Sequence, residues 1–328
     1  MVLILVGGFH PEMPYEEIKA LGVDIEERDG RVVVGEVEDV EKLERLGFSH
    51  LVLKCLGSFG VDEKLPFDPE KYIEGKFAAR FKNLGFSGSR EEKKEEILEE
   101  LNPNIESVDL DNPDTTFYFL MKGEKIYVGK LIHRFDPTEF TERKSGMKPY
   151  SRPVSLKPRE ARCWINLSGA RGDLLDPFCG TGTILVEAGL AGYNVYGSDS
   201  EDDMVSGSIT NMKHYGVEGE VRKSRVQNLS KIWNRTFDVV VTDPPYGRSA
   251  KVCSVGIKNL YRSSLKEIES ILKNNGRCVI GCPSNMGFEK ILNETGSVFE
   301  VLNKFTEKIH GDLIREIFVL GKTNKKFK

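Results

Sequence analysis

The residues best suited to chemistry form a short run in which a carboxylate stands between apolar residues and two prolines. The run reads Asp243-Pro244-Pro245-Tyr246-Gly247 and follows the apolar run Val239-Val240-Val241 after one threonine. An amine on a flat base is a poor nucleophile because its lone pair is delocalised into the ring. The Asp243 carboxylate and the Pro244 carbonyl could each accept one N–H of such an amine, and Tyr246 offers a stacking face. We therefore predict group transfer to an exocyclic amine; the alternative is a structural Asp-Pro-Pro turn with a packed tyrosine.

A turn containing two glycines offers a place for the second reactant. It joins a short apolar strand to a helix and reads Asp176-Pro177-Phe178-Cys179-Gly180-Thr181-Gly182-Thr183. Glycines let the backbone approach a ligand closely, and the N-terminus of the following helix favours an anionic or carboxylate group. No lysine follows the second glycine, and the spacing is not Gly-x-Gly-x-x-Gly. The turn is therefore neither a P-loop nor typical of a nicotinamide dehydrogenase. A purely structural turn is the alternative.

A third candidate is Asp199, which ends the next short strand 23 residues after Asp176. An acid at about this spacing can accept both hydroxyls of a ribose. A lone aspartate at a strand end is often only a cap. Together with the glycine turn, Asp199 favours a cofactor that contains a nucleoside.

The elements that must position these residues alternate between strand and helix from Gly172 onward. This alternation is typical of a parallel, doubly wound sheet. Such sheets bind ligands outside the carboxyl ends of their strands, so the three aspartates are expected at one edge. Strands are predicted over 172–178, 194–199, 236–247, 277–282 and 315–322, with helices over 183–192 and 265–276.

The first half of the chain has a different pattern, with short strands and few helices. Strands are predicted over 1–8, 31–37, 49–59 and 76–83, followed by two strands joined at Gly123. Helices are predicted over 14–21, 40–46 and 89–103; the last has a charged face that we interpret as solvated. The predicted domains are an N-terminal α+β, ferredoxin-like region (1–50), a second α+β domain (51–135), a linker (136–162) and a catalytic domain (163–328).

The linker is the segment best placed to contact phosphates. It contains four prolines, shows little periodicity and carries more basic than acidic residues. A solvated hinge is the alternative, and it is compatible with phosphate contacts. The basic residues predicted to bind nucleic acid are Arg134, Arg143, Lys144, Lys148 and Arg152.

Composition excludes several classes of protein. The chain has 328 residues, 39% of them hydrophobic, and a net charge of −4, which excludes a strongly basic, histone-like binder. No apolar run approaches the length of a membrane span, and we interpret the opening MVLILVGG as a buried strand rather than a signal peptide. Six cysteines without a CxxC pair favour a reduced, cytoplasmic protein, and five scattered histidines give no metal site. A monomer is the expected state.

The three motifs together carry a family resemblance. DPFCGTGT, the acid at Asp199 and DPPYG resemble the class I methyltransferases that use S-adenosyl-L-methionine to methylate exocyclic amines. FAARFKN and VDLDNPDTTFYFLMKGEKIYVGK resemble a THUMP domain, an RNA-binding module of tRNA-modifying enzymes. RPVSLKPREARCWINLSG resembles the segment that leads into the catalytic domain. The whole chain resembles the tRNA guanine-N2 methyltransferases that act at position 10.

The resemblance implies a fold and a set of binding residues. The fold is an α/β Rossmann-like methyltransferase domain with a mostly parallel seven-stranded sheet, preceded by an α+β THUMP-containing, RNA-binding region. The glycine turn would hold the methionine moiety of the cofactor, Asp199 with its neighbours Ser198 and Ser200 the ribose, and Ser155 and Leu156 the methionine carboxylate. The family's acid for the adenine is replaced by Ser224-Arg225-Val226, so the backbone, or Gln227 or Asn228, would recognise the adenine.

The resemblance also implies tRNA as the partner, with an accessory protein as a further partner in some members. The predicted reaction is direct in-line methyl transfer to a flipped-out base, without a covalent intermediate. One or two methyl groups could be added. Three alternatives remain open: guanosine 6 of tRNA, an rRNA guanine or adenine N6, and a non-catalytic RNA-binding scaffold. The late segment His310-Gly-Asp-Leu-Ile-Arg315 is either a substrate contact or a hairpin with a buried arginine.

Overall fold

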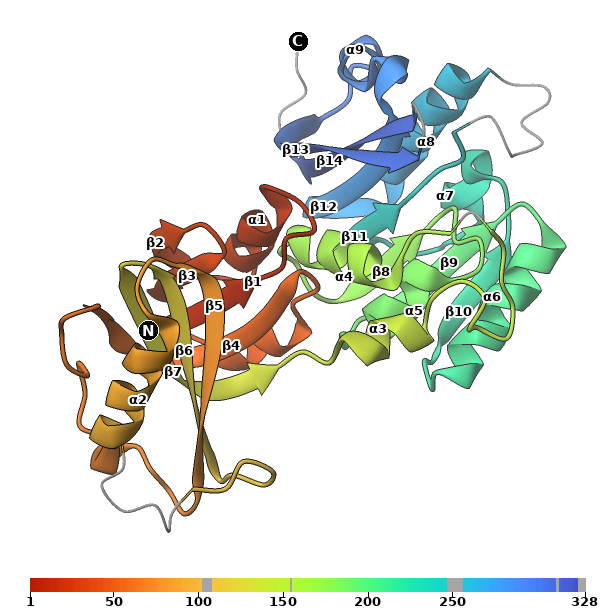
Figure 1. Ribbon diagram of the computed structural model, residues 1–328. Coiled ribbons are helices and arrows are strands. Elements are labelled where there is room, and N and C mark those ends of the chain that lie inside the picture. Colours follow the sequence, from red (N-terminus) through yellow and green to blue (C-terminus); the bar gives the residue numbers. More distant parts are fainter. Residues whose placement is uncertain (102–107, 154, 247–255, 311–312, 324–328) are drawn as a thin grey trace. The chain divides into compact units, whose positions relative to one another are not determined.

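The computed structural model describes residues 1–101, 108–153, 155–246, 256–310 and 313–323. The chain forms two compact units (Figure 1). The first unit consists of Met1–Phe9, Gly22–Glu44 and Ser49–Asp136. The second consists of His10–Leu21, Arg45–Phe48 and Pro137–Lys328. An early part of the chain therefore belongs to the unit that contains the three motifs.

The first unit is built on a seven-stranded sheet with the order β2-β3-β1-β4-β7-β6-β5. All neighbours pair antiparallel except β5 and β6, which are parallel. The strands are β1 (Val2–Val6), β2 (Asp24–Asp29), β3 (Val32–Glu36), β4 (Ser49–Gly60), β5 (Phe77–Phe86), β6 (Thr115–Gly123) and β7 (Lys125–Arg134). The helices are α2 (Arg90–Leu101) and the 3-10 helices η1 (Val40–Arg45) and η2 (Pro69–Lys71).

This sheet crosses the expected boundary between residues 50 and 51. Strand β1 is wholly buried, so the backbone groups along both of its edges need partners. It finds them in β3 on one side and in β4 on the other. The segments 1–50 and 51–135, expected as two regions, thus contribute strands to one sheet.

Residue alternation explains how the sheet buries both of its faces. Along β6, Phe117, Phe119 and Met121 belong to one apolar cluster, which also contains Ile97 and Leu101 of α2. The intervening Tyr118 and Leu120 belong to the other cluster, with residues of β1 and β3. Successive side chains of a strand point to opposite faces, so one strand can serve two cores.

The second unit has a mixed seven-stranded sheet with the order β10-β9-β8-β11-β12-β14-β13. The strands are β8 (Asp173–Asp176), β9 (Asn194–Asp199), β10 (Gly219–Lys223), β11 (Phe237–Thr242), β12 (Leu272–Pro283), β13 (Phe299–His310) and β14 (Leu313–Lys322). The expectation of a mostly parallel sheet is corrected here. Strand β14 pairs antiparallel with both β12 and β13, whereas the other neighbouring strands of this sheet pair parallel.

Helices of the second unit alternate with its parallel strands (Figure 1). They are α1 (Met13–Ala20), α3 (Pro137–Glu142), α4 (Pro158–Leu167), α5 (Thr183–Leu190), α6 (Asp202–His214), α7 (Leu229–Ile232), α8 (Ile257–Ile271) and α9 (Phe288–Glu294), with the 3-10 helices η4 (Val226–Asn228) and η5 (Ser284–Met286). The segment 136–162, expected as a linker, therefore contains α3 and the start of α4. Pro158 is compatible with α4 because proline is tolerated in the first helical turn.

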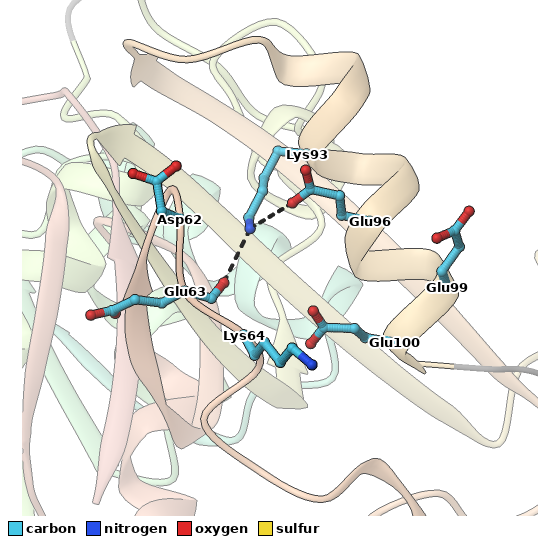
Figure 2. A pocket seen from close by; sticks show the side chains of 7 residues that line it. All are labelled: Asp62, Glu63, Lys64, Lys93, Glu96, Glu99 and Glu100. Carbon is cyan, nitrogen blue, oxygen red and sulfur yellow. Dashed lines mark hydrogen bonds and ion pairs between the residues drawn. The ribbon is translucent and has the colours of Figure 1, made fainter.

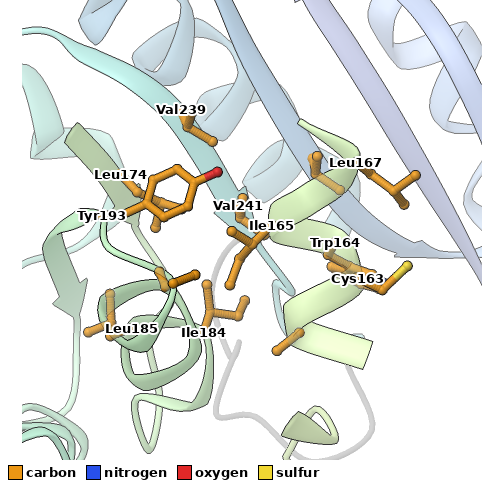
Figure 3. Packing of buried hydrophobic residues seen from close by; sticks show 14 of the residues in the cluster. Cys163, Trp164, Ile165, Leu167, Leu174, Ile184, Leu185, Tyr193, Val239 and Val241 are labelled. Carbon is orange, nitrogen blue, oxygen red and sulfur yellow. The ribbon is translucent and has the colours of Figure 1, made fainter. Parts of the chain in front are cut away.

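Helix α4 lies in the core of the second unit (Figure 3). Trp164 and Ile165 are fully buried and share a cluster with Leu174 of β8, Leu185 of α5 and Val241 of β11. Burying side chains of this size contributes about 1.5–3 kcal/mol each. These contacts fix α4 against the strands whose ends carry the motifs.

Helix α1 is tied to α4 by a buried carboxylate. Glu17 has no exposed surface and accepts hydrogen bonds from Gly47 N (2.6 Å), Phe48 N (2.9 Å) and Asn166 Nδ2 (2.7 Å). Burial raises the pKa of Glu17, although the hydrogen bonds oppose the shift. Glu17 thereby connects α1, the 45–48 segment and α4. Among the described residues, no helix is long and apolar enough to cross a membrane.

Candidate active site

The three aspartates lie at one edge of the second unit's sheet. Asp176 ends β8, Asp199 ends β9 and Asp243 follows the last residue of β11. These strands are neighbours in the order β9-β8-β11 and run parallel. Their carboxyl ends therefore share the edge at which open α/β sheets bind ligands. Gly247, the last residue of the Asp-Pro-Pro-Tyr-Gly run, lies outside the described residues.

The glycine turn is held tightly between β8 and α5. Gly182 has φ +77°, and its N donates to Cys179 O (2.8 Å). A Cβ at Gly182 would lie 2.9 Å from Cβ of Ser208, so both conformation and space require glycine. Cys179 N donates to Ser198 O (3.0 Å), which links the turn to β9. Burial raises the pKa of the Cys179 thiol well above its usual value, which makes it unsuited as a nucleophile.

Asp199 supports the turn and retains acceptor capacity. Its Oδ2 accepts from Gly180 N (2.9 Å) and its Oδ1 from Glu201 N (3.1 Å). A carboxylate has about four lone-pair sites, so these two bonds leave room for ligand hydroxyls. Burial raises the pKa of Asp199, and the backbone hydrogen bonds oppose the shift.

Asp176, the last residue of β8, is hydrogen-bonded to the end of the neighbouring strand β11. It is 1% exposed, and its Oδ1 accepts from Thr242 Oγ1 (2.7 Å) and Phe178 N (3.1 Å). Burial, with smaller contributions from Asp199 and Asp243, raises the pKa of Asp176 to about 7. Its bonds to Thr242 and Phe178 hold the turn beside the Asp243 motif.

Asp243 is oriented by two donors. Arg315 donates through Nη1 to Oδ2 (3.0 Å), and the Tyr246 hydroxyl donates to Oδ1. Burial raises the pKa of Asp243, while Arg315 and Tyr246 oppose that shift by stabilising the ionised form. Gly281 of β12 makes room for this arrangement, because a Cβ there would lie 2.4 Å from Oδ1 of Asp243.

Arg315 is the centre of a buried charge cluster. It is 4% exposed and donates through Nε to Glu307 (2.6 Å) and through Nη2 to Glu160 (3.1 Å), in addition to Asp243. Its guanidinium carbon lies 4.7 Å from the ring centroid of Trp164, within cation–π distance. The interpretation of the late segment as a hairpin with a buried arginine agrees with the burial of Arg315. The hydrogen bond from Arg315 to Asp243 was not predicted. Gly311 and Asp312 lie outside the described residues.

Sequence reasoning missed the residues that orient Asp243. Glu160 is in α4, Glu307 in β13 and Gly281 in β12, so no local spacing relates them to Asp243. One signal was present: Arg315 stands two residues before the strongly apolar run Ile317-Phe318-Val319-Leu320, and a charge beside a buried strand needs partners.

The remaining residues predicted to bind the cofactor fall into two groups. Ser155 lies at the glycine turn, with Oγ 3.2 Å from Thr181 Oγ1, and Leu156 packs against the core. Ser198 is buried and Ser200 is exposed beside Asp199. Gln227 and Asn228 are half-buried in η4, near the end of β10. Ser224 N donates to Asp199 O (2.8 Å), which joins this segment to the ribose candidate.

The five basic residues predicted to bind RNA differ in their exposure. Arg134, Lys144 and Arg152 are exposed. Arg143 instead pairs with buried Glu187 at 2.6 Å, and Lys148 is 6% exposed and donates to two threonines of the glycine turn. Arg143 and Lys148 therefore have hydrogen-bond partners inside the second unit and do not point into solvent.

The first unit carries an acidic hollow of about 380 Å³ (Figure 2). It is lined by Asp62, Glu63, Lys64, Lys93, Glu96, Glu99 and Glu100. Lys93 is itself engaged, since Nζ donates to Glu63 O (3.1 Å) and Glu96 Oε2 (2.8 Å). The excess of negative charge disfavours phosphate binding here. Among the described residues, no acid, cysteine or histidine cluster is suited to hold a metal ion.

Comparison with known proteins covers the whole chain. A family model described as the RMKL-like methyltransferase domain matches residues 145–314. The tRNA (guanine(10)-N2)-dimethyltransferase of Pyrococcus abyssi is 37% identical over 338 residues, covering 98% of this chain and 99% of the relative. The protein of the same name from Methanothermobacter thermautotrophicus is 31% identical, covering 97% and 98%.

Solved structures agree with the fold. The crystal structure of TrmN from Thermus thermophilus has a TM-score of 0.55 at 21% identity and covers 98% of this chain and 99% of its own. The crystal structure of SMU.472 complexed with SAH has a TM-score of 0.53 at 16% identity, covering 100% and 99%.

Proposed function

Because the chain belongs to the RMKL-like methyltransferase family, we propose that it methylates the exocyclic N2 of guanosine 10 in tRNA, using S-adenosyl-L-methionine. The observation that carries the proposal is the oriented Asp243 carboxylate at the end of β11. Relatives matched over their full length are named tRNA (guanine(10)-N2)-dimethyltransferases, which supports both the substrate and the addition of two methyl groups.

The residues around the glycine turn fit the cofactor. At Gly180 the place of a Cβ is open apart from Phe178 O at 4.0 Å, so a ligand can approach the backbone there, and Asp199 has unused lone pairs for ribose hydroxyls. Ser155 and the turn would hold the methionine moiety, and Gln227 or Asn228 the adenine. When bound, the cofactor supplies a methyl group on a sulfonium, which is already strongly electrophilic. The protein therefore needs to position the acceptor rather than activate the donor.

Asp243 would prepare the acceptor amine. Its carboxylate accepts one N–H of the guanine N2 and the Pro244 carbonyl accepts the other, which draws the nitrogen lone pair out of conjugation. Arg315 favours the ionised carboxylate that this role requires. The Tyr246 hydroxyl donates to Oδ1, which has a second lone pair. Oδ1 can therefore accept a guanine N–H in addition to the tyrosine hydroxyl, or in its place.

The target base must leave its stack to reach Asp243, at a cost of a few kcal/mol. Stacking on Tyr246 would offset about 1–3 kcal/mol of that cost. We assign RNA binding to the first unit, as a THUMP-like domain, and to the exposed cations Arg134, Lys144 and Arg152. The acidic hollow of Figure 2 is excluded from this role by its charge.

Product mapping tests the proposal and its alternatives. Purified protein is incubated with labelled S-adenosylmethionine and an unmodified tRNA transcript, and the methylated nucleoside is then identified and located. N2,N2-dimethylguanosine at position 10 is expected. Methylation at position 6, or of rRNA instead, would overturn the substrate assignment while leaving the reaction type. Cofactor binding without transfer to any RNA would overturn the enzymatic function in favour of a scaffold.

A further inference from the structure

Lys148 is a buried cation whose hydrogen bonds run to hydroxyls rather than to acids. Its Nζ donates to Thr183 Oγ1 (2.7 Å) and to Thr181 Oγ1 (3.1 Å), and the residue is 6% exposed. Among the described residues, no carboxylate forms an ion pair with it. A buried ammonium without a paired charge is costly, so this arrangement needs an explanation.

Glu187 of α5 is the acid that acts on Lys148, but its carboxylate already pairs with Arg143 (2.6 Å) and Arg162 (2.9 Å). The Glu187 carboxylate is thus used by two arginines, and Lys148 has no ion pair of its own among the described residues. Burial lowers the pKa of Lys148 to about 8, and Glu187 only partly opposes that shift. At neutral pH most Lys148 side chains are still charged.

Lys148 also lies against the N-terminus of helix α5, which is an unfavourable place for a cation. Thr183 is the first residue of α5, and the N-terminus of a helix carries partial positive charge. A cation at this end is unfavourable, whereas an anion bound between them would interact well with both. A further hydroxyl faces the same place, since Ser155 Oγ lies 3.2 Å from Thr181 Oγ1.

We propose that Lys148 binds the α-carboxylate of the cofactor's methionine moiety, together with the hydroxyls of Ser155, Thr181 and Thr183. This inference rests on the proposed function, because it takes the ligand to be S-adenosylmethionine or its product. It assigns to cofactor binding a lysine that the sequence assigned to RNA. The carboxylate supplies a negative charge to pair with the Lys148 ammonium, and its oxygens can accept from that ammonium and from hydroxyls of the turn.

The test compares two ligands that differ in the methionine carboxylate. S-Adenosylhomocysteine carries it, whereas 5′-methylthioadenosine keeps the adenosine and the thioether but lacks the amino-acid end. In Lys148→Met, the Kd for S-adenosylhomocysteine should rise about 10- to 100-fold by calorimetry, as for the loss of a charged hydrogen bond. The Kd for 5′-methylthioadenosine should stay within about twofold.

Lys213→Met is the matched control, since Lys213 is exposed in α6 of the same unit and has no assigned role. It should alter neither affinity. Equal weakening of both ligands by Lys148→Met would overturn the proposal in favour of a purely structural role. An unchanged Kd for S-adenosylhomocysteine in that variant would overturn it as well. Failure of the proposed function is seen separately, as a wild-type protein that binds S-adenosylhomocysteine yet methylates no tRNA.

Discussion

At the residue scale, the reaction depends on a half-buried carboxylate that is held ionised so that it can accept a hydrogen bond from an amine. Asp243 meets this demand because Arg315 and Tyr246 each donate to one of its oxygens. The Asp243 motif and the glycine turn were identifiable from the sequence, since each is a local run of residues. Arg315 was named as a buried arginine or a substrate contact, but its pairing with Asp243, Glu160 and Glu307 was not predicted, because these residues come from elements that meet only in the folded protein.

Asp243→Ala should abolish methyl transfer while leaving cofactor binding nearly intact. The variant removes the acceptor for the guanine amine, whereas the glycine turn and Asp199 keep their own hydrogen bonds. Single-turnover transfer to tRNA and calorimetry with S-adenosylhomocysteine measure the two effects. A large loss of cofactor affinity in this variant would contradict the assigned role.

Arg315 is a positioning residue, and its removal should shift the pH profile. Burial raises the pKa of Asp243, and Arg315 opposes that shift, so Arg315→Met should raise the pKa further. Asp243 must be ionised to accept the amine, so activity falls as pH falls through this pKa. The acid limb of kcat should therefore move to higher pH in Arg315→Met, and less so in Arg315→Lys.

A structural role alone would give a different result for Arg315. Leaving buried acids unpaired costs about 3–5 kcal/mol, so some loss of stability is expected in any case. Melting curves at each pH identify the range in which the variant is folded. A lowered kcat within that range, with an acid limb at the wild-type position, would contradict the positioning role.

At the element scale, the sequence predicted most strands because their patterns of apolar residues are local. It did not predict β2, whose residues Asp24–Asp29 are mostly charged and lie at the edge of the sheet. It also placed α1 with the first region, although α1 belongs to the second unit. Helix α1 is tied to the second unit by the buried hydrogen bonds of Glu17 with Gly47 and Asn166. These partners are 30 and 149 positions away in the sequence, so no local pattern reveals them.

Glu17→Ala should destabilise the second unit. It leaves the buried donors of Gly47, Phe48 and Asn166 without this acceptor, at a cost of about 1–3 kcal/mol each before relaxation. The protein has two tryptophans, Trp164 and Trp233, and both lie in the second unit, so tryptophan fluorescence in urea reports on this unit.

The matched control for Glu17 is Lys19→Ala in the same helix. Lys19 is exposed and pairs with Glu16 at the surface, so its loss should cost less than about 0.5 kcal/mol. Equal urea midpoints for the wild type and Glu17→Ala would show that Glu17 does not anchor α1.

At the whole-molecule scale, charge is distributed unevenly over a chain whose net charge is only −4. Sequence reasoning treated the basic residues of 136–162 as one group. The structure separates them into two kinds. Arg143 pairs with buried Glu187 and Lys148 donates to a threonine of the glycine turn, whereas Lys144 and Arg152 are exposed to solvent. Burial could not be predicted from composition, so this separation required the fold.

Lys144→Glu should therefore weaken tRNA binding and reduce the slope of log Kd against log salt by about 1 or more. Lys64→Glu is the matched control, since Lys64 is exposed in the acidic hollow of the first unit. Filter binding over a range of salt concentrations measures both variants. Equal slopes for Lys144→Glu and the wild type would remove Lys144 from the RNA-binding surface.

The most direct test of the account uses two tRNA transcripts that differ in one amine. One transcript carries guanosine at position 10, and the other carries inosine, which keeps the ring and lacks the exocyclic N2. With labelled S-adenosylmethionine, we expect up to two methyl groups per guanosine transcript and none on the inosine transcript. Equal methylation of both transcripts would show that the methylated group is not the N2 of guanosine 10 and would contradict the central claim.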